Sequence, residues 1–311
     1  MKLYAYTLPL ATPLRFAGHA LTERQGLLIK LEQDGRTGWG DCAPLPGFSQ
    51  DTLEQCADAL KAMRDGQAQE QDLPPAARFA LDCARWQLQN PTPLRLPSPV
   101  PLLVGTPDEQ LAQYEQLTER PGEVKLKLAR ASVEEEIALV YGLLERNPKL
   151  KLRIDANRGW SYEQASHFAT CVPRSALRYV EEPCRELNDT LRLHAQHRLP
   201  LALDETTQHP DYQYESLAGV RALVLKPTLI GSLTRLQHLV EQATLDGVEV
   251  VLSSSFESNI GVSHLARLAT ELTPTSVPGL DTLTALGADL IEPNPWGQDK
   301  PLITESELKP L

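Results

Sequence analysis

Aromatic residues, sulfur-containing residues and long hydrophobic runs are all scarce in this sequence. Phe, Trp and Tyr make up 5% of its 311 residues, and it holds two Met and five Cys. The odd number of cysteines, none of them in a Cys-x-x-Cys pair, argues against a disulfide framework and against a zinc knuckle. No apolar stretch approaches the roughly 18 residues that a membrane helix needs, and the first residues lack the pattern of a signal peptide. We therefore expect a cytoplasmic protein with reduced thiols.

Basic residues are also fewer than acidic ones. The chain has 30 Lys and Arg against 41 Asp and Glu, which gives a net charge of -11 and a pI near 5.2. Nucleic acids and anionic membranes are bound by clustered cations, so we expect neither of them as a partner. A hydrophobic fraction of 41% and a charged fraction of 23% are ordinary for a globular protein.

The first part of the chain has the pattern of a small α+β domain. Residues 91–101 hold five prolines, which is typical of a connection between two units. The elements predicted before it are two strands joined by a turn at Asp34-Gly35, followed by two helices: Leu27–Glu32, Thr37–Asp41, Thr52–Arg64 and Pro75–Gln89. We place this domain at residues 1–97 and expect residues 292–311 to pack back onto it.

After residue 98, short apolar runs alternate with amphipathic helical stretches. The strand-like runs are VPLLV, VKLKLA, KLRIDA, LRYVEEP, LALDET, ALVLKP, EVVLSSS and VPGLD, and the helices between them include Val133–Glu145 and Leu233–Leu245. This alternation fits a parallel barrel or an open doubly wound sheet. The even spacing, and the absence of a GxGxxG turn after the first strand, favour a barrel of the α/β class. A barrel carries its chemistry at the C-terminal ends of the strands.

Charged residues stand near the ends of five successive predicted strands. They are Lys125 with Lys127, Asp155, Glu181, Asp204 and Lys226, at intervals of 28, 26, 23 and 22 residues from Lys127 onward. A single acid at a strand end is usually a helix cap, and a Lys-x-Lys pair is usually a solvated strand face. The order K–D–E–D–K, at one strand-helix unit per step, instead indicates one site at the mouth of the barrel. Spacing alone leaves open whether Glu181 or Glu182 points inward, and likewise Asp204 or Glu205.

The residue types in this pattern predict a metal-dependent reaction on a carboxylate substrate. Three carboxylates are hard oxygen ligands of the kind that suits Mg²⁺, and no His or Cys cluster favours zinc. Removing a proton next to a carboxylate produces an enediolate dianion. A metal and one ammonium group can hold that charge, while a neutral lysine accepts the proton.

The motifs around these residues resemble those of the enolase superfamily, in the branch with muconate-lactonizing enzyme and dipeptide epimerase. More closely, they resemble the o-succinylbenzoate synthase family of the proteobacterial menaquinone pathway. The motifs are GWGDCAPLPGFSQDT (38–52), VKLKLAR (124–130), LRIDANRGWS (152–161), YVEEPCR (179–185), LALDET (201–206), LVLKPTLIGSL (223–233), LSSSFESNIG (252–261) and PGLDT (278–282). The resemblance implies a modified TIM barrel, (β/α)₇β, at residues 98–291 with an α+β capping domain.

The same resemblance implies a role for each site residue. Asp155, Glu181 and Asp204 are the implied Mg²⁺ ligands, with Mn²⁺ as the alternative ion. Lys127 is the implied base and Lys226 the cation that stabilises the enediolate on the opposite face. Five further residues are implied to act around them: Lys125 and Asn157 in support, and Arg153, Ser253 and Gly279 lining the substrate site.

The implied reaction is syn dehydration of 2-succinyl-6-hydroxy-2,4-cyclohexadiene-1-carboxylate to 2-succinylbenzoate. Pro44–Ser49 resembles the cap loop that reaches toward the barrel mouth. Arg15–Arg24 lies where the family has a loop that covers the substrate, although no motif marks it here. Relatives of this length suggest a monomer.

Two other functions compete with dehydration. Lysines on opposite faces also suit N-succinylamino acid racemase or dipeptide epimerase, but SSSFES and PLPGFS favour the dehydrating family. A non-catalytic ligand-binding barrel would be expected to lack a ligand or a lysine, whereas all five positions are filled here.

Overall fold

The computed structural model describes residues 1–16, 19–90 and 100–311. These residues form two compact units. The first comprises the described residues of 1–98, 226–240 and 252–311, and the second those of 99–225 and 241–251. The proline-rich connection predicted at residues 91–101 lies outside the described residues except for its last two positions. The predicted boundaries, 1–97 and 98–291, therefore stay a prediction.

The first unit contains an antiparallel sheet with the strand order β13-β1-β2-β3. Its strands are β1 (Lys2–Phe16), β2 (His19–Gln33), β3 (Arg36–Cys42) and β13 (Lys309–Pro310). Positive φ angles of 51° at Asp34 and 74° at Gly35 make the tight turn between β2 and β3. The two strands and the turn predicted in this region are thus confirmed, and the C-terminal residues add the edge strand beside β1.

The prediction of a loop at Arg15–Arg24 is wrong. Strand β1 runs on to Phe16 and β2 starts at His19, with pairs such as Leu14 with Leu21. Only residues 17 and 18 of this segment lie outside the described residues. Pro9 and Pro13 conceal the strand in the sequence, because proline cannot donate a ladder hydrogen bond. The ladder accommodates them through a register shift between Pro9 and Leu14.

Two helices of the first unit pack beside this sheet, α1 (Leu53–Arg64) and α2 (Pro75–Gln89), as predicted. Thr52 caps α1 in a capping box, and Pro75 occupies the first turn of α2. Strand β3 and α2 approach so closely that a Cβ at Gly40 would lie 1.9 Å from the carbonyl oxygen of Ala80. The second glycine of the GWGD motif, Gly40, is therefore required by packing.

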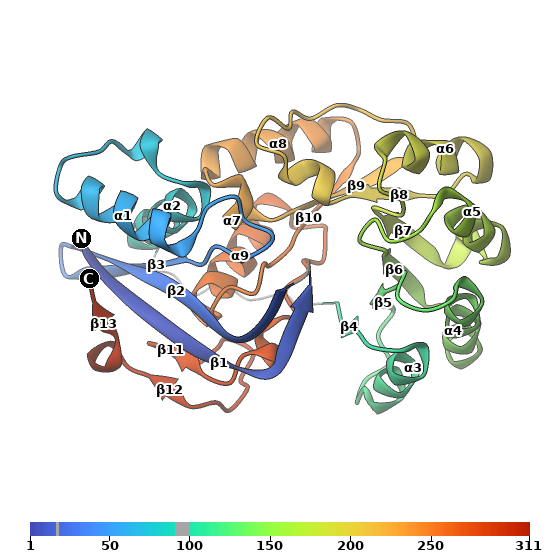
Figure 1. The fold of residues 1–311 in the computed structure, drawn as a ribbon, viewed down its shortest axis with the longest axis horizontal. Helices are drawn as coiled ribbons and strands as arrows, with labels where there is room; N and C mark the ends of the chain where they lie inside the picture. The colour runs from blue at the N-terminus through green and yellow to red at the C-terminus, as the bar shows by residue number, and fades with distance from the viewer. Residues whose placement is uncertain (17–18, 91–99) are drawn as a thin grey trace. The chain divides into compact units, whose positions relative to one another are not determined.

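The second unit is built on a parallel sheet, and helices α3 to α6 flank its strands on one side (Figure 1). The sheet has seven strands in the order β10-β9-β8-β7-β6-β5-β4. They are β4 (Leu102–Leu103), β5 (Glu123–Lys127), β6 (Lys151–Asp155), β7 (Leu177–Glu181), β8 (Leu201–Leu203), β9 (Val220–Leu225) and β10 (Glu249–Leu252). The flanking helices are α3 (Pro107–Gln116), α4 (Val133–Arg146), α5 (Tyr162–Cys171) and α6 (Leu187–His197). The alternation of strands and helices in the sequence predicted this arrangement.

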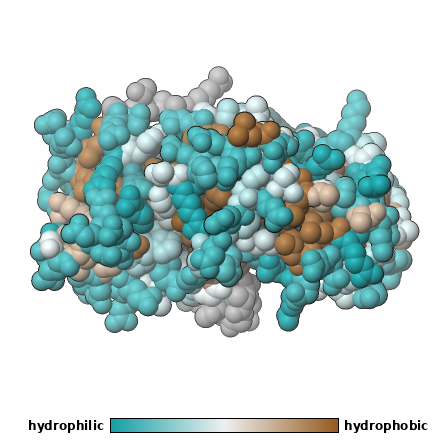
Figure 2. Space-filling model, turned by 90° about the horizontal axis from the view of Figure 1, so that it is seen from above, coloured by the Kyte–Doolittle hydropathy of each residue, from teal (hydrophilic) through white to brown (hydrophobic). Residues whose placement is uncertain are grey.

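The remaining elements are α7 (Pro227–Ile230), α8 (Leu233–Leu245), α9 (Asn259–Leu272), β11 (Asp289–Leu290) and β12 (Leu302–Ile303). The last strand expected in the barrel, VPGLD, is reduced to a parallel bridge between Ser253 and Gly279. Within the described residues no helix is both long and apolar enough to cross a bilayer. The face drawn in Figure 2 shows mainly hydrophilic side chains, with hydrophobic ones in smaller groups between them.

Candidate active site

The charged residues predicted at the strand ends occupy equivalent positions in the second unit. Lys127, Asp155 and Glu181 are the last residues of β5, β6 and β7. The parallel ladder pairs Lys127 with Asp155 and Asp155 with Glu181, so these residues lie at one level of the sheet. Asp204 directly follows β8. The prediction that the intervals in sequence correspond to neighbouring strands is confirmed.

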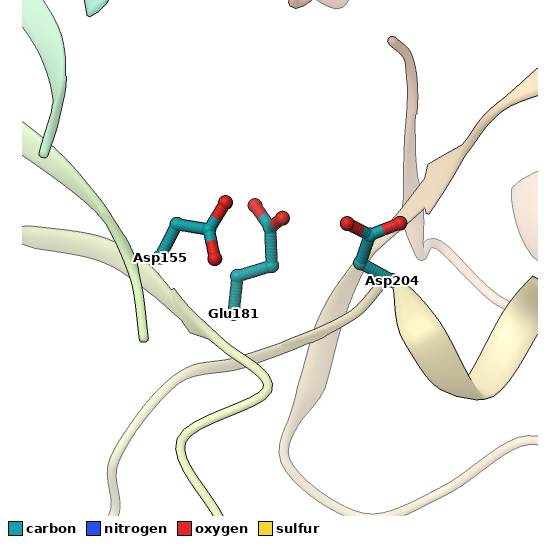
Figure 3. A group of neighbouring side chains, drawn as sticks. All are labelled: Asp155, Glu181 and Asp204. Carbon is teal, nitrogen blue, oxygen red and sulfur yellow. The ribbon is translucent and has the colours of Figure 1, made fainter. Parts of the chain in front are cut away.

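The three acids converge on one point. Asp155, Glu181 and Asp204 each offer an oxygen, and these oxygens all lie within 4.8 Å of one another. Their carboxylate groups approach one another from the ends of neighbouring strands (Figure 3). None of the three side chains is more than 2% exposed. Buried acids this close together are costly unless cations neutralise them.

Two lysines supply part of that neutralisation. The Lys125 Nζ lies 2.8 Å from an oxygen of Asp155 and 2.8 Å from an oxygen of Glu181. The Lys127 Nζ lies 2.5 Å from Asp155 Oδ2 and 3.0 Å from Asn157 Oδ1. Both ammonium groups are thus on the same side of β5 as the acids, as the spacing of two residues predicts.

The pKa values of Asp155 and Glu181 are shifted in opposite directions. Burial alone would lower the pKa of Lys125, but Asp155 and Glu181 outweigh it and hold that pKa well above its ordinary value. Burial also opposes ionisation of Asp155, but Lys125 and Lys127 prevail and keep the pKa of Asp155 well below its ordinary value. In contrast, burial and then Asp155 raise the pKa of Glu181 well above 4.5. The two lysines therefore favour the ionised form of Asp155 more than that of Glu181.

This donor set fits a divalent metal ion. All three candidate ligands are carboxylates, the hard oxygen ligands that Mg²⁺ and related cations bind. A divalent cation would also offset the burial and the repulsion from Asp155 that raise the pKa of Glu181. The three buried acids can therefore hold a metal ion.

The structure also distinguishes the adjacent acids that the sequence left open. Glu181 belongs to the convergent trio, whereas Glu182 accepts hydrogen bonds from the backbone N–H groups of Asp204 and Thr206, at 3.1 and 2.7 Å. Glu205 accepts a hydrogen bond of 3.0 Å from the Asn157 side chain. The choice of Glu181 and Asp204 thus agrees with the convergence of side chains.

Gln208 contacts the site residue Asp204, and the sequence did not predict this contact. Its Nε2 donates a hydrogen bond of 2.8 Å to Asp204 Oδ1, from the short 3₁₀ helix Glu205–Gln208 that follows β8. A residue four positions after an acid in a loop gives no periodic signal, so only the structure could find it.

Arg153 lies two residues before Asp155 on β6 and is 2% exposed. Its Nε donates to Glu123 Oε1 at 2.5 Å, and its guanidinium lies 5.6 Å from the centre of the Tyr179 ring. Glu249 is a further acid near it, at 3.9 Å. Arg153 thus belongs to a charged layer inside the sheet, and its predicted contact with substrate stays a prediction.

Three predicted site residues belong to the first unit. Lys226 directly follows β9, and its Nζ lies 5.9 Å from the centre of the Phe48 ring, within the PLPGFS segment. The hydroxyl of Ser253 donates a hydrogen bond of 3.2 Å to the carbonyl oxygen of Gly279. The two residues of this bridge therefore adjoin each other, as neighbouring positions of one predicted site should.

Metal affinity should depend on pH through Glu181. Because the pKa of Glu181 is raised above 4.5, protonation competes with metal binding at pH values where an ordinary glutamate is fully ionised. Asp155, with a lowered pKa, adds nothing in that range. We expect the apparent Kd for Mg²⁺ to fall as pH rises above the range in which an ordinary glutamate ionises, by up to about tenfold per pH unit. Calorimetric titrations in two buffers of different ionisation enthalpy measure this, and a flat Kd with no proton release would contradict it.

Comparison with known proteins identifies the family of the chain. Residues 1–88 match the family model described as "MenC, N-terminal domain", and residues 109–294 match "Enolase C-terminal domain-like". An o-succinylbenzoate synthase from Yersinia pestis (strain Pestoides F) is 40% identical over 98% of this chain and 97% of its own length.

Solved structures share the fold. An o-succinylbenzoate synthase from Thermosynechococcus elongatus BP-1, described as complexed with Mg in the active site, superposes with a TM-score of 0.73 at 24% identity, over 97% of this chain and 95% of its own. The L-Ala-D/L-Glu epimerase from Bacillus subtilis gives a TM-score of 0.79 at 20% identity, over 92% and 90%. At these identities the likeness concerns the fold.

The match to the enolase C-terminal domain-like family over residues 109–294, together with a parallel sheet whose strand ends carry converging acids, defines an enzyme of the enolase superfamily. Within that superfamily the chain belongs to the o-succinylbenzoate synthase family, and it is a lyase. The resemblance drawn from the motifs is confirmed.

Proposed function

We propose that the chain catalyses the syn dehydration of 2-succinyl-6-hydroxy-2,4-cyclohexadiene-1-carboxylate to 2-succinylbenzoate in menaquinone biosynthesis. Asp155, Glu181 and Asp204 would bind the Mg²⁺ ion, with Mn²⁺ as a possible substitute. The bound ion supplies positive charge that stabilises an enediolate. The observation that carries the proposal is the position of the Lys127 ammonium, 2.5 Å from one of the three metal-binding acids.

Lys127 is the proposed base. In its neutral form it removes the proton from the ring carbon that bears the carboxylate. The C–O bond at the neighbouring carbon then breaks as the ring becomes aromatic, and Lys127 returns the proton to the departing hydroxyl, which leaves as water. One lysine can serve both steps because a syn elimination keeps the proton and the hydroxyl on one face of the ring.

The other predicted site residues would bind the substrate or orient the metal ligands and the base. Lys226 stabilises the enediolate through its charge, and Lys125 and Asn157 support the metal ligands and the base. Arg153, Ser253 and Gly279 line the substrate site. The partner is a small carboxylate substrate, not a nucleic acid or a membrane, and we propose a monomer in the cytoplasm.

A direct assay tests the reaction against its nearest competitors. We expect the purified chain with Mg²⁺ to remove the ultraviolet absorbance of the cyclohexadiene substrate. Optical rotation of an N-succinylamino acid and of a dipeptide is followed in parallel, because N-succinylamino acid racemase and dipeptide epimerase share the superfamily. Racemisation or epimerisation without dehydration would overturn the proposal, and no turnover of any substrate would favour a non-catalytic barrel.

A further inference from the structure

The acid beside the metal-binding Glu181 has a distinct set of contacts. Glu182 is 1% exposed, and its Oε1 accepts the backbone N–H groups of Asp204 at 3.1 Å and Thr206 at 2.7 Å. Its Oε2 accepts the Nε of Arg158 at 3.0 Å. Arg158 in turn donates from Nη2 to Thr206 Oγ1 at 2.9 Å. We call these three residues, Arg158, Glu182 and Thr206, the strand-end clamp.

The strand-end clamp joins the three chain segments that follow β6, β7 and β8, next to the candidate metal ligands. Arg158 lies three residues after Asp155, Glu182 directly after Glu181, and Thr206 two residues after Asp204. The backbone is tied as well, because the N–H of Arg158 donates to the carbonyl oxygen of Glu182 at 2.7 Å. These contacts therefore fix the ends of the three ligand-bearing strands relative to one another.

The backbone of the strand-end clamp is held in an unfavourable conformation. Arg158 and Glu182 have φ angles of 60° and 40°, in the left-handed region that side chains with a Cβ rarely adopt. Neighbouring Asn157, whose side chain accepts from Lys127, has a φ of 43°. Such conformations persist where surrounding contacts impose them, and they cluster at functional sites. Here the imposed turn directs Glu182 away from the metal-binding acids and toward the backbone of the next loop.

We propose that Arg158 and Glu182 are positioning residues, which hold Asp155, Glu181 and Asp204 in the arrangement that binds the metal ion. This inference rests on the proposed function, since it presumes that the three acids bind Mg²⁺. Neither residue is one of the three convergent acids, so they act through the chain segments next to the ligands. Residues that orient metal ligands in this way commonly change metal affinity about 10- to 100-fold.

Arg158→Met is the decisive variant. The Arg158 side chain is 33% exposed, so methionine can replace it without opening the core. We expect the Kd for Mg²⁺, measured by calorimetry, to rise about tenfold or more, while kcat at saturating Mg²⁺ stays within a few-fold of the parent. Arg158→Lys keeps the charge but cannot bond Glu182 and Thr206 with one planar group, so it should recover only part of the affinity.

Arg146→Met is the matched control. The Arg146 side chain is 32% exposed, and it pairs with Glu115 between the helices α4 and α3. The Arg146→Met variant should leave the Kd for Mg²⁺ unchanged.

Glu182→Gln provides a second test, because it retains the acceptor for the two N–H groups but places an amide donor against the Arg158 Nε. It should weaken Mg²⁺ binding to an extent similar to that of Arg158→Met.

The outcomes separate the two proposals. If the parent binds Mg²⁺ and dehydrates its substrate, but Arg158→Met binds Mg²⁺ as tightly as Arg146→Met, the positioning role is overturned and the function stands. A parent that binds Mg²⁺ without dehydrating would overturn the function, and a Kd raised by Arg158→Met would then still support the positioning role. Absence of Mg²⁺ binding by the parent overturns both. A loss of kcat at saturating Mg²⁺ with an unchanged Kd would also overturn the positioning role.

Discussion

Replacing Lys127 with alanine is expected to reduce kcat for dehydration by a factor of about 10² to 10⁴. The alanine variant has no group to accept the proton at this position, and no other lysine shares its contact with Asn157 among the hydrogen bonds of the described residues. Mg²⁺ binding should be retained or become tighter, because Lys127 contributes a positive charge 2.5 Å from Asp155. Single-turnover kinetics and calorimetric titration with Mg²⁺ measure the two effects separately.

Two further variants distinguish proton transfer from simple charge. Lys127→Arg keeps a cation near Asp155, but a guanidinium does not deprotonate in proteins and cannot act as a base, so we expect it to be about as inactive as Lys127→Ala. Lys149→Ala, which truncates an exposed lysine before β6, should have the parent kcat. Substantial activity in Lys127→Arg would mean that the charge, and not the proton transfer, is what the reaction needs, and the assignment of the base would fail.

The candidate metal site could be predicted because the geometry of a parallel sheet brings its residues together. In parallel strands joined by helices, the C-terminal ends lie at one edge, so charges that recur once per strand-helix unit must converge there. The ladder pairing of Lys127, Asp155 and Glu181 is the outcome of that rule. Helix boundaries such as Pro75–Gln89 could also be predicted, because a proline in the first turn and an apolar stripe mark them.

Other features depend on contacts that leave no local pattern. The β1–β2 hairpin is stabilised by cross-strand pairing, which overrides the prolines at 9 and 13. Glu182 has a φ of 40° directly after β7, and the sequence carries no visible signal for that turn. Arg153 shows a third limit, because a buried arginine can equally complete a charged layer with Glu123 or face a ligand.

The second large effect concerns Glu181, whose removal should abolish metal binding without weakening the metal-free fold. A group whose pKa is raised in the folded state stabilises that state below its unfolded pKa, and this contribution is lost as pH rises through the folded value. Burial and Asp155 raise the pKa of Glu181 well above 4.5, so ionisation of Glu181 opposes folding. Glu181→Gln removes this cost and keeps an oxygen that can accept from Lys125. We expect the metal-free Tm to stay the same or to rise.

Asp155→Asn is the matched comparison, with the opposite sign. Lys125 and Lys127 hold the pKa of Asp155 well below its ordinary value in spite of burial, so ionised Asp155 stabilises the fold at pH values above its unfolded pKa. Its neutral replacement leaves two lysines without this carboxylate, and the metal-free Tm should fall.

Thermal unfolding of both variants, with and without Mg²⁺, measures the contrast. The parent should gain about 2.7 kcal/mol of stability at a Mg²⁺ concentration about 100 times its Kd, and both variants should lose most of this gain. A metal-free Glu181→Gln protein as destabilised as Asp155→Asn would show that Glu181 mainly stabilises the fold through Lys125. An undiminished Mg²⁺ effect in Glu181→Gln would remove Glu181 from the metal site. The expected result is a Glu181→Gln protein whose metal-free stability is equal or higher but which no longer binds Mg²⁺. It would mean that Glu181 provides an ion-binding site without stabilising the metal-free fold, which is a common property of active-site residues.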